Sequence, residues 1–227
     1  DQYLTAMSVS SSQVQDILPC SPIQQGILLT QMQLPWAYLI YQTCRITSSN
    51  HDRPVAVDRL IKAWKQVVAR HCVLKTVLME PLPNQEKFVQ IVLTDPEVDV
   101  VCVDGVLDED ATQWFAAQSQ LDLSDRRRPP HRLTTLATTS GEIYCRFDIS
   151  HALVDASSMT LIIHDLIYAY ENGVTTGGSN YSSYIQFPES RHQQCDLPYW
   201  QSALQNAEPF FLSSHDRTLS LSRYRAK

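Results

Sequence analysis

The sequence predicts an α/β (α+β) fold with a mixed sheet flanked by helices. Segments with the apolar period of an amphipathic helix interleave with segments that alternate like half-buried strands, and several of the expected strands follow one another directly. The chain has 227 residues, of which 44% are hydrophobic, so it is long enough to bury one large core or two smaller ones.

The expected elements begin after a leader over residues 1–16, part of which is rich in Ser and Gln. A short helix follows, with Ser21 as its N-cap and Pro22 in its first turn. Strands are expected over residues 38–46, 73–78, 88–93, 98–103, 131–138 and 143–149. Helices are expected over residues 57–70, 108–120, 159–170, 182–187 and 197–205. A turn at Ser140-Gly141 joins the last two strands.

Composition and charge exclude several classes of function. The net charge of −6 disfavours binding to nucleic acid, and neither glycine-rich nucleotide-binding motif is present. The 6 cysteines are far apart and have no zinc-ligand spacing, which indicates a reducing compartment and no metal site. No apolar run approaches the roughly 18 residues that cross a bilayer, so we expect a soluble, cytoplasmic protein that does not bind a membrane.

The functional prediction centres on His151, which lies between an expected strand and an expected helix. The residues before it alternate over 143–149, and apolar residues recur at helical spacing from Met159, with Ser157 or Ser158 as the N-cap. Such strand ends line clefts, because a rigid sheet holds the side chain while the loop exposes it to substrate. An imidazole can accept and return a proton near neutral pH. This context leaves open whether His151 is an active base or a structural histidine.

Asp155 follows four residues later, and we expect it to have a structural role. A carboxylate in a tight turn can accept backbone N–H groups or pair with a buried cation, and either contact would fix the loop that aims His151. The same spacing occurs in His192 and Asp196, but no expected strand leads to that pair. We therefore interpret the second pair as a solvated loop or a helix start.

Four further segments carry motifs, at residues 18–28, 70–78, 121–133 and 181–200. The first reads L-P-C-S-P-I-Q-Q-G-I-L and the second reads R-H-C-V-L-K-T-V-L. Together, and in this order, the segments resemble the N-terminal lobe of a nonribosomal peptide synthetase condensation domain, within the chloramphenicol acetyltransferase-like superfamily. In the second segment, Lys75 and Leu78 replace the second Arg and the Phe of the family motif R-H-x-x-L-R-T-x-F.

The central motif of that family is usually H-H-x-x-x-D-G, and here it reads S-H-A-L-V-D-A over residues 150–156. This variant is similar to the terminal condensation-like domains of fungal synthetases, whose signature is S-H-x-x-x-D, fourteen residues and then Tyr. Residues 156–169 are the fourteen, and Tyr170 follows. Ser150 replaces the first histidine and either fills space or hydrogen-bonds the loop. Ala156 replaces the glycine, and its backbone N–H could face the substrate carbonyl.

The resemblance implies a reaction in secondary metabolite biosynthesis. Such a domain takes a linear peptidyl thioester from the phosphopantetheine arm of a peptidyl carrier (thiolation) domain and releases it by intramolecular amide formation, which is macrocyclisation. Precursors of the fumiquinazoline type are the first substrates to consider. His151 is the expected catalytic residue, either as general base or as hydrogen-bond partner of the tetrahedral intermediate. The chain itself is expected to bind no cofactor and no metal.

Three further residues are expected to support the site or the core around it. Arg70 is the first candidate cation for Asp155, and Arg146 is the second. Tyr170 shares a helical face with apolar residues and is expected to pack in the core.

Residues 17–212 are expected to form the N-terminal lobe, and residues 213–227 to form a linker towards a missing C-terminal lobe. In the family that lobe closes a tunnel over the site, so we expect little or no activity from the chain alone. Three alternatives remain open. They are an ordinary amide-forming condensation domain, a coenzyme A-dependent acyltransferase of the same superfamily, and a non-catalytic domain that recruits a carrier.

Overall fold

The structure is a computed structural model, and it describes residues 2–48, 54–83, 85–173, 182 and 193–207. The chain divides into two units, Asp1–Gln186 and Phe187–Lys227. Helix α7 (Gln193–Ala203) belongs to the second unit and overlaps the helix expected over residues 197–205. The expected helix over 182–187, apart from its first residue, and the expected linker over 213–227 lie outside the described residues, as does His192 of the second His/Asp pair.

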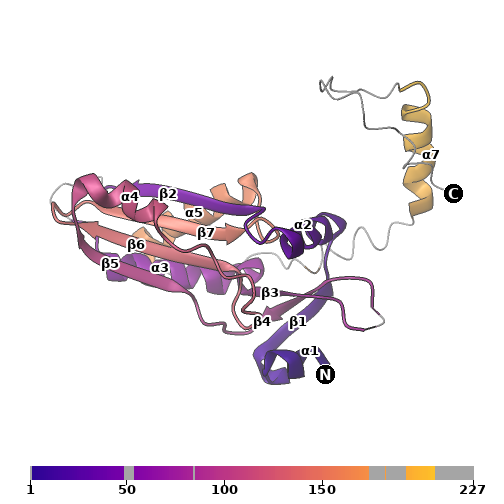
Figure 1. The fold of residues 1–227 in the computed structure, drawn as a ribbon, viewed down its shortest axis with the longest axis horizontal. Helices are drawn as coiled ribbons and strands as arrows, with labels where there is room; N and C mark the ends of the chain where they lie inside the picture. The colour runs from indigo at the N-terminus through magenta and orange to yellow at the C-terminus, as the bar shows by residue number, and fades with distance from the viewer. Residues whose placement is uncertain (1, 49–53, 84, 174–181, 183–192, 208–227) are drawn as a thin grey trace. The chain divides into compact units, whose positions relative to one another are not determined.

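The larger sheet of the first unit is mixed, as the sequence predicts. Its strand order is β2 (Leu39–Ile46), β7 (Ile143–Ser150), β6 (His131–Thr138) and β5 (Val100–Val106). Neighbouring strands are antiparallel, except for β5 and β6, which are parallel. Strand β7 is therefore an interior strand with a partner on each side, so its backbone is held along its whole length (Figure 1).

The turn between β6 and β7 confirms the prediction at Ser140-Gly141. Gly141 has φ +90°, a left-handed conformation that glycine adopts without the clash a Cβ would cause. Its N–H donates to the carbonyl oxygen of Thr138 at 3.0 Å, which closes the turn. This tight connection sets the register in which β7 runs beside β6.

A smaller antiparallel sheet has the strand order β1 (Val14–Pro19), β4 (Val89–Leu93) and β3 (Thr76–Met79). The segment expected as a leader over residues 1–16 differs from that expectation, because it contains helix α1 (Gln2–Met7), a 3₁₀ turn at Ser11–Gln13 and the start of β1. Tyr3 and Met7 are buried against apolar residues of β3 and β4. Their burial makes this segment part of the folded unit.

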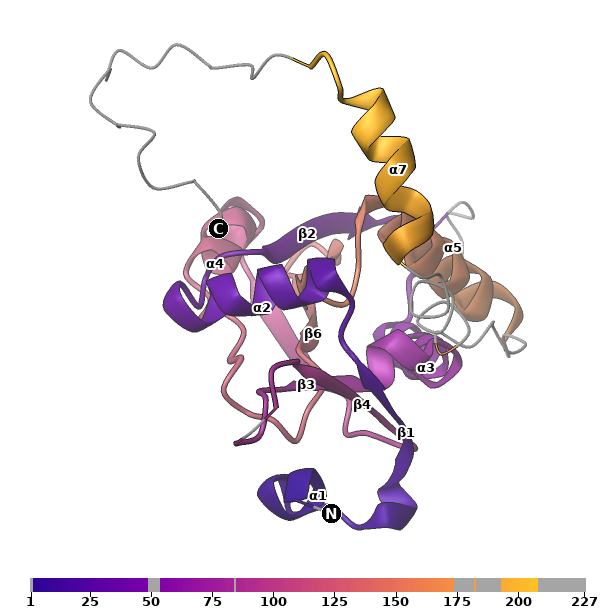
Figure 2. The same ribbon diagram turned by 90° about the vertical axis from the view of Figure 1, so that its right-hand side faces the viewer.

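Helices α3 (Val57–Arg70) and α5 (Ala156–Asn172) pack on one face of the larger sheet, and the short helix α4 (Ala111–Ala116) lies on the other (Figure 2). Alternate β7 residues Cys145, Phe147 and Ile149 face the two long helices and belong to the main core. Among the described residues, none of the helices is long and apolar enough to cross a membrane.

Two expected elements differ in secondary structure over part of their length. The strand expected over residues 73–78 is a 3₁₀ turn at Cys72–Lys75 followed by β3, because a short apolar run has no period that separates the two conformations. The helix expected over residues 108–120 is a 3₁₀ turn at Asp108–Asp110 followed by the six residues of α4.

Helix α2 (Pro22–Gln33) begins as the sequence predicts. Ser21 is its N-cap and accepts the backbone N–H of Gln24, while Pro22 occupies the first turn. The helix lies beyond the end of the larger sheet towards which β7 points (Figure 1). Residues of α2 therefore lie beside the end of β7 and the loop that follows it.

The packing of α3 on the sheet gives a first prediction. Trp64 is 0% exposed. Its ring meets the His131 ring edge-on with the centroids 5.6 Å apart, and it lies tilted against the Phe147 ring with the centroids 5.4 Å apart. We expect Trp64→Ala to lower the free energy of unfolding by about 3–5 kcal/mol through the cavity it leaves. Trp64→Phe should cost less, since it keeps a ring and removes a buried indole N–H that has no partner among the described residues. Urea unfolding followed by circular dichroism measures both, and a loss below about 1 kcal/mol for Trp64→Ala would contradict this packing.

Candidate active site

His151 directly follows β7, at the point where the strand leaves the sheet. Its backbone N–H donates to the carbonyl oxygen of Tyr38 at 2.8 Å, which extends the ladder between β2 and β7 by one bond. The next three residues, Ala152 to Val154, are 4–6% exposed and lie in the main core. His151 and Asp155 on either side of them are exposed. The loop is thus anchored by its apolar centre and presents both polar side chains to solvent.

Tyr38 shapes the site in a way that the sequence analysis missed. Its φ is +56°, a left-handed conformation that costs a non-glycine residue roughly 1–2 kcal/mol. Its ring meets the His151 ring edge-on, with the centroids 6.3 Å apart and an interplanar angle of 83°. Such strain is held by surrounding contacts and is often found near functional groups. No local pattern in the sequence indicates it.

Ser150 hydrogen-bonds the loop, which is one of the two roles expected for it. The side chain is 0% exposed, and its Oγ accepts the backbone N–H of Ala152 at 3.3 Å and the Nε2 amide of Gln31 at 3.2 Å. The Nε2 amide of Gln24 donates to the carbonyl oxygen of Ala152 at 3.0 Å. Both backbone groups of Ala152 are therefore satisfied by buried side chains, the N–H by Ser150 and the carbonyl oxygen by Gln24. The sequence analysis did not single out Gln24 or Gln31, the two glutamines of α2 that take part.

Asp155 is the N-cap of α5, so the expected caps Ser157 and Ser158 are wrong. Its Oδ1 accepts the backbone N–H of Ser158 at 2.8 Å, and its own N–H donates to the Ser158 Oγ at 2.7 Å, which forms a capping box. These hydrogen bonds, first the backbone N–H and then the hydroxyl, lower the pKa of Asp155 below its ordinary value. Asp155 thus fixes the loop through backbone capping.

The expected ion pair of Asp155 is not formed with either candidate arginine. Arg70 Nε lies 3.2 Å from Asp165 Oδ2 on α5, and Arg146 Nε lies 2.5 Å from Asp148 Oδ1 on its own strand. Each arginine therefore pairs with another carboxylate, Arg70 with Asp165 and Arg146 with Asp148, and not with Asp155. An exposed N-cap needs no buried cation, because backbone N–H groups already stabilise its charge.

Tyr170 and Ala156 lie at opposite ends of α5. The Tyr170 hydroxyl accepts the backbone N–H of Ala56 at 3.0 Å, and the Arg59 guanidinium lies 4.8 Å from the centre of its ring. Tyr170 therefore joins the start of α3 to the end of α5, about 21 Å along the helix from Ala156. Ala156 is the first residue of α5, where backbone N–H groups have no partner within the helix and can meet an anion.

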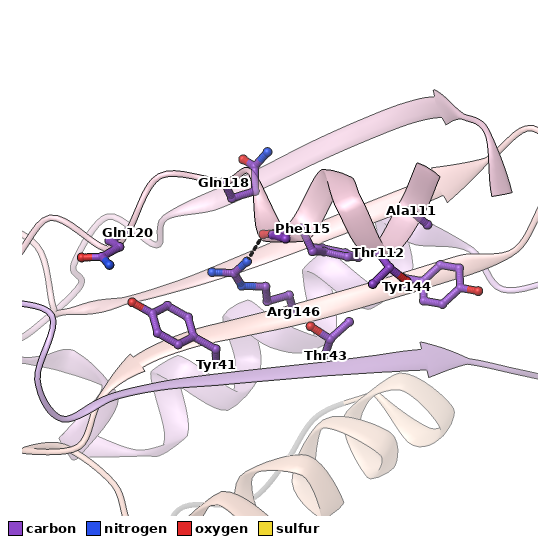
Figure 3. Close-up of a pocket in the computed structure, with 10 residues that line it drawn as sticks. Tyr41, Thr43, Ala111, Thr112, Phe115, Gln118, Gln120, Tyr144 and Arg146 are labelled. Carbon is purple, nitrogen blue, oxygen red and sulfur yellow. Dashed lines mark hydrogen bonds between the residues drawn. The ribbon is translucent and has the colours of Figure 1, made fainter. Parts of the chain in front are cut away.

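A cavity of about 570 Å³ lies on the other face of the larger sheet, between α4 and the strands (Figure 3). Arg146 lines it, donates to the carbonyl oxygen of Phe115 and lies 4.8 Å from the centre of the Tyr41 ring. Burial raises the pKa of its partner Asp148, and the Arg146 guanidinium opposes that shift. Arg146 thus holds α4 to the sheet, on the face away from the long helices.

In the part of the chain that the structure describes, no group of three or more His, Cys, Asp or Glu is placed to hold a metal ion.

The structure thus places an exposed histidine at the end of an interior strand, directly before a capped helix. The model of the condensation-domain family matches residues 14–226, and the chain belongs to that family. The expected fold class is thereby confirmed, as is the resemblance to a condensation domain of fungal nonribosomal peptide synthetases. Condensation domains form amide bonds and work with carrier protein domains.

Two curated relatives are fungal synthetases. The chain is 85% identical to "Nonribosomal peptide synthetase 32" of Fusarium pseudograminearum over 97% of its length, and 57% identical to "Nonribosomal peptide synthetase vlms" of Lecanicillium sp over 92%. In each case it spans 2% of the relative. The match therefore concerns one small segment of very long proteins.

Solved structures share the fold at low sequence identity. A structure titled "The crystal structure of CT" matches with a TM-score of 0.70 and 18% identity, over 94% of this chain and 48% of the other. A variant of the starter condensation domain of the rhizomide synthetase RzmA matches with a TM-score of 0.68 and 18% identity, over 86% of this chain and 49% of the other. The chain thus spans about half of each.

The cap of α5 gives a second prediction. Asp155→Ala should lower the free energy of unfolding by about 1 kcal/mol at pH 7, whereas Asp155→Asn, which keeps the cap, should cost only a few tenths. Because folding lowers the pKa of Asp155, its contribution is present above the ordinary carboxyl value and is lost as the pH falls through the folded value. The Asp155→Ala deficit should therefore shrink in acid. Urea unfolding at pH 7 and at pH 3 measures this, and equal losses for the two variants would refute the capping role.

Proposed function

We propose that this chain is the histidine-bearing lobe of a terminal condensation-like domain, which releases a carrier-bound linear peptidyl thioester by intramolecular amide formation. The observation that carries the proposal is the exposed imidazole of His151 on a loop whose centre is buried. The S-H-x-x-x-D motif with its following Tyr170 supports the terminal type. The substrate arrives on the phosphopantetheine arm of the carrier, and this chain binds no cofactor of its own.

In this reaction a nitrogen nucleophile of the peptide attacks the thioester carbonyl carbon. The new C–N bond forms and the C–S bond breaks, so the ring closes and the carrier thiol leaves. His151 takes the proton from the attacking nitrogen and returns it to the departing sulfur, so that protons balance over the cycle. General base catalysis of this kind contributes roughly 10²–10⁴-fold. Because both reacting groups belong to one chain, holding that chain curled supplies further rate through effective molarity.

The oxyanion of the tetrahedral intermediate needs a hydrogen-bond donor nearby. The first backbone N–H groups of α5, beginning with that of Ala156, lie just past the loop that carries His151. The imidazole itself can also donate once it holds the proton. The remaining wall of the site is assigned to a second lobe, since the solved relatives are about twice as long as this chain.

A second candidate is ordinary amide formation between two carrier-bound substrates. The family match over residues 14–226 favours it, because it is the general reaction of condensation domains. The same histidine would then remove a proton from an amine that arrives on a second carrier. The two candidates differ in the source of the nucleophile and share the role of His151.

The test uses the complete synthetase domain that contains this chain and a carrier domain loaded with a synthetic tripeptide. Mass spectrometry should show a cyclic product, and His151→Ala should lower its rate of formation by about 10²–10⁴-fold. His164→Ala is the matched control, because its side chain is 79% exposed on α5, and it should retain the wild-type rate.

The alternatives give different products. A linear acid would mean that water reaches the thioester, and a product that forms only when a second loaded carrier is added would favour ordinary condensation. Wild-type turnover that survives in His151→Ala would refute the catalytic role of this residue. Specific carrier binding without turnover, unaffected by His151→Ala, would instead indicate a recruiting domain.

A further inference from the structure

The buried amide of Gln31 reaches two segments that are far apart in the sequence. Gln31 is 7% exposed on the last turn of α2, and its Nε2 donates to the carbonyl oxygen of Ala37 at 3.0 Å and to Ser150 Oγ at 3.2 Å. The carbonyl oxygen of Tyr38 lies 3.4 Å from the same nitrogen. One side chain therefore connects the turn before β2 with Ser150 at the end of β7, which lies 119 residues after Gln31 in the sequence.

The groups that Gln31 contacts are the ones that hold His151. The Tyr38 carbonyl oxygen accepts the His151 N–H at 2.8 Å, and Ser150 Oγ accepts the Ala152 N–H at 3.3 Å. The backbone N–H groups of His151 and Ala152, one on each side of the His151 α-carbon, therefore donate to Tyr38 O and Ser150 Oγ. Both of these acceptor atoms lie within 3.4 Å of the Gln31 side-chain amide. A shift of that amide would move both acceptors.

Gln31 also bears on the strained backbone of Tyr38. An amide N–H directed at the carbonyls of residues 37 and 38 stabilises the turn in which Tyr38 takes φ +56°. That turn brings the Tyr38 ring edge-on to the imidazole, with centroids 6.3 Å apart. The orientation of the imidazole therefore depends on a turn that the buried Gln31 side chain stabilises by hydrogen bonding.

Little space remains between Ser150 and Gln31, although Gln31 also lines a second cavity of about 420 Å³ beside α2. The cavity beside them, lined by Leu28 and Pro130 among others, holds about 20 Å³, roughly the room of one water molecule. Ser150 is 0% exposed, so a larger side chain at this position would need the volume that Gln31 occupies. The two residues fit together as a pair.

We propose that Gln31 is a positioning residue for His151, acting through Tyr38 and Ser150, and that Gln31 and Ser150 depend on each other. The proposal rests on the proposed function, because it takes His151 to be the reacting group. Misplacing a catalytic group by about 1 Å can cost about 100-fold in rate. The loss of the Gln31 amide is therefore expected to act on the chemical step.

The test compares Gln31→Met with Gln33→Met in the complete domain with its loaded carrier. Methionine is unbranched and similar in size but has no amide donor, and Gln33 is exposed at the end of the same helix, so it serves as the control. Gln31→Met should lower kcat by about 10- to 100-fold with KM changed less than about twofold. Gln33→Met should match the wild type.

A second measurement does not depend on turnover. Diethyl pyrocarbonate modifies exposed histidines, and peptide mapping gives the rate at His151 with the exposed His164 as internal reference. Gln31→Met should change the rate at His151 at least about threefold relative to His164, because the environment of the ring changes. A purely structural loss would lower the unfolding midpoint and leave this ratio in the folded protein unchanged.

A double variant tests the pairing. Ser150→His should lower kcat at least about tenfold, and adding Gln31→Ala to it should lower kcat by less than Gln31→Ala does alone, since the smaller side chain frees the volume the imidazole needs. Additive losses in the double variant would overturn the pairing.

An unchanged His151 reactivity together with unchanged kcat in Gln31→Met would overturn the positioning role while leaving the proposed function intact. A wild type without turnover would overturn the proposed function, and the reactivity of His151 would still decide the role of Gln31.

Discussion

The hydrogen bond from the His151 N–H to the Tyr38 carbonyl oxygen is the contact on which the site depends. It continues the β2–β7 ladder one residue beyond the strand, so the backbone of His151 is held by the sheet. Burial of Ala152, Leu153 and Val154 then draws the following backbone inward. These two effects act on either side of the imidazole, and together they expose a side chain whose backbone is fixed.

The side chains of β7 make different interactions on the two faces of the larger sheet. Its apolar residues pack against α3 and α5, whereas Arg146 and Asp148 on the opposite face form an ion pair of side chains that are 10% and 2% exposed. Breaking such a pair by removing one partner is costly, because it leaves an uncompensated buried charge. The strand is thus held by apolar packing on one side and by charge on the other, which limits its movement beneath the site.

The order of elements around His151 could be predicted from local patterns, because alternation before it and helical spacing after it are strong signals. The cap of α5 was assigned wrongly, since Asp155 and the two serines after it all have the chemistry of an N-cap. The partners of Arg70 and the contacts of Gln31 come from segments distant in the chain, and spacing carries no information on such contacts. The segment before β1 is expected to be a leader because Ser and Gln dominate it from Ser8 onwards, and that composition does not show that Tyr3 and Met7 pack against the smaller sheet.

The most direct test of this account is amide hydrogen exchange at His151 in the folded protein. If the sheet and the buried turn fix its backbone, the His151 amide should exchange at least about 100-fold more slowly than in an unstructured peptide, although its side chain is exposed. Exchange at the unprotected rate, while the amides of β7 stay protected, would show that the loop moves freely and would contradict a preorganised site.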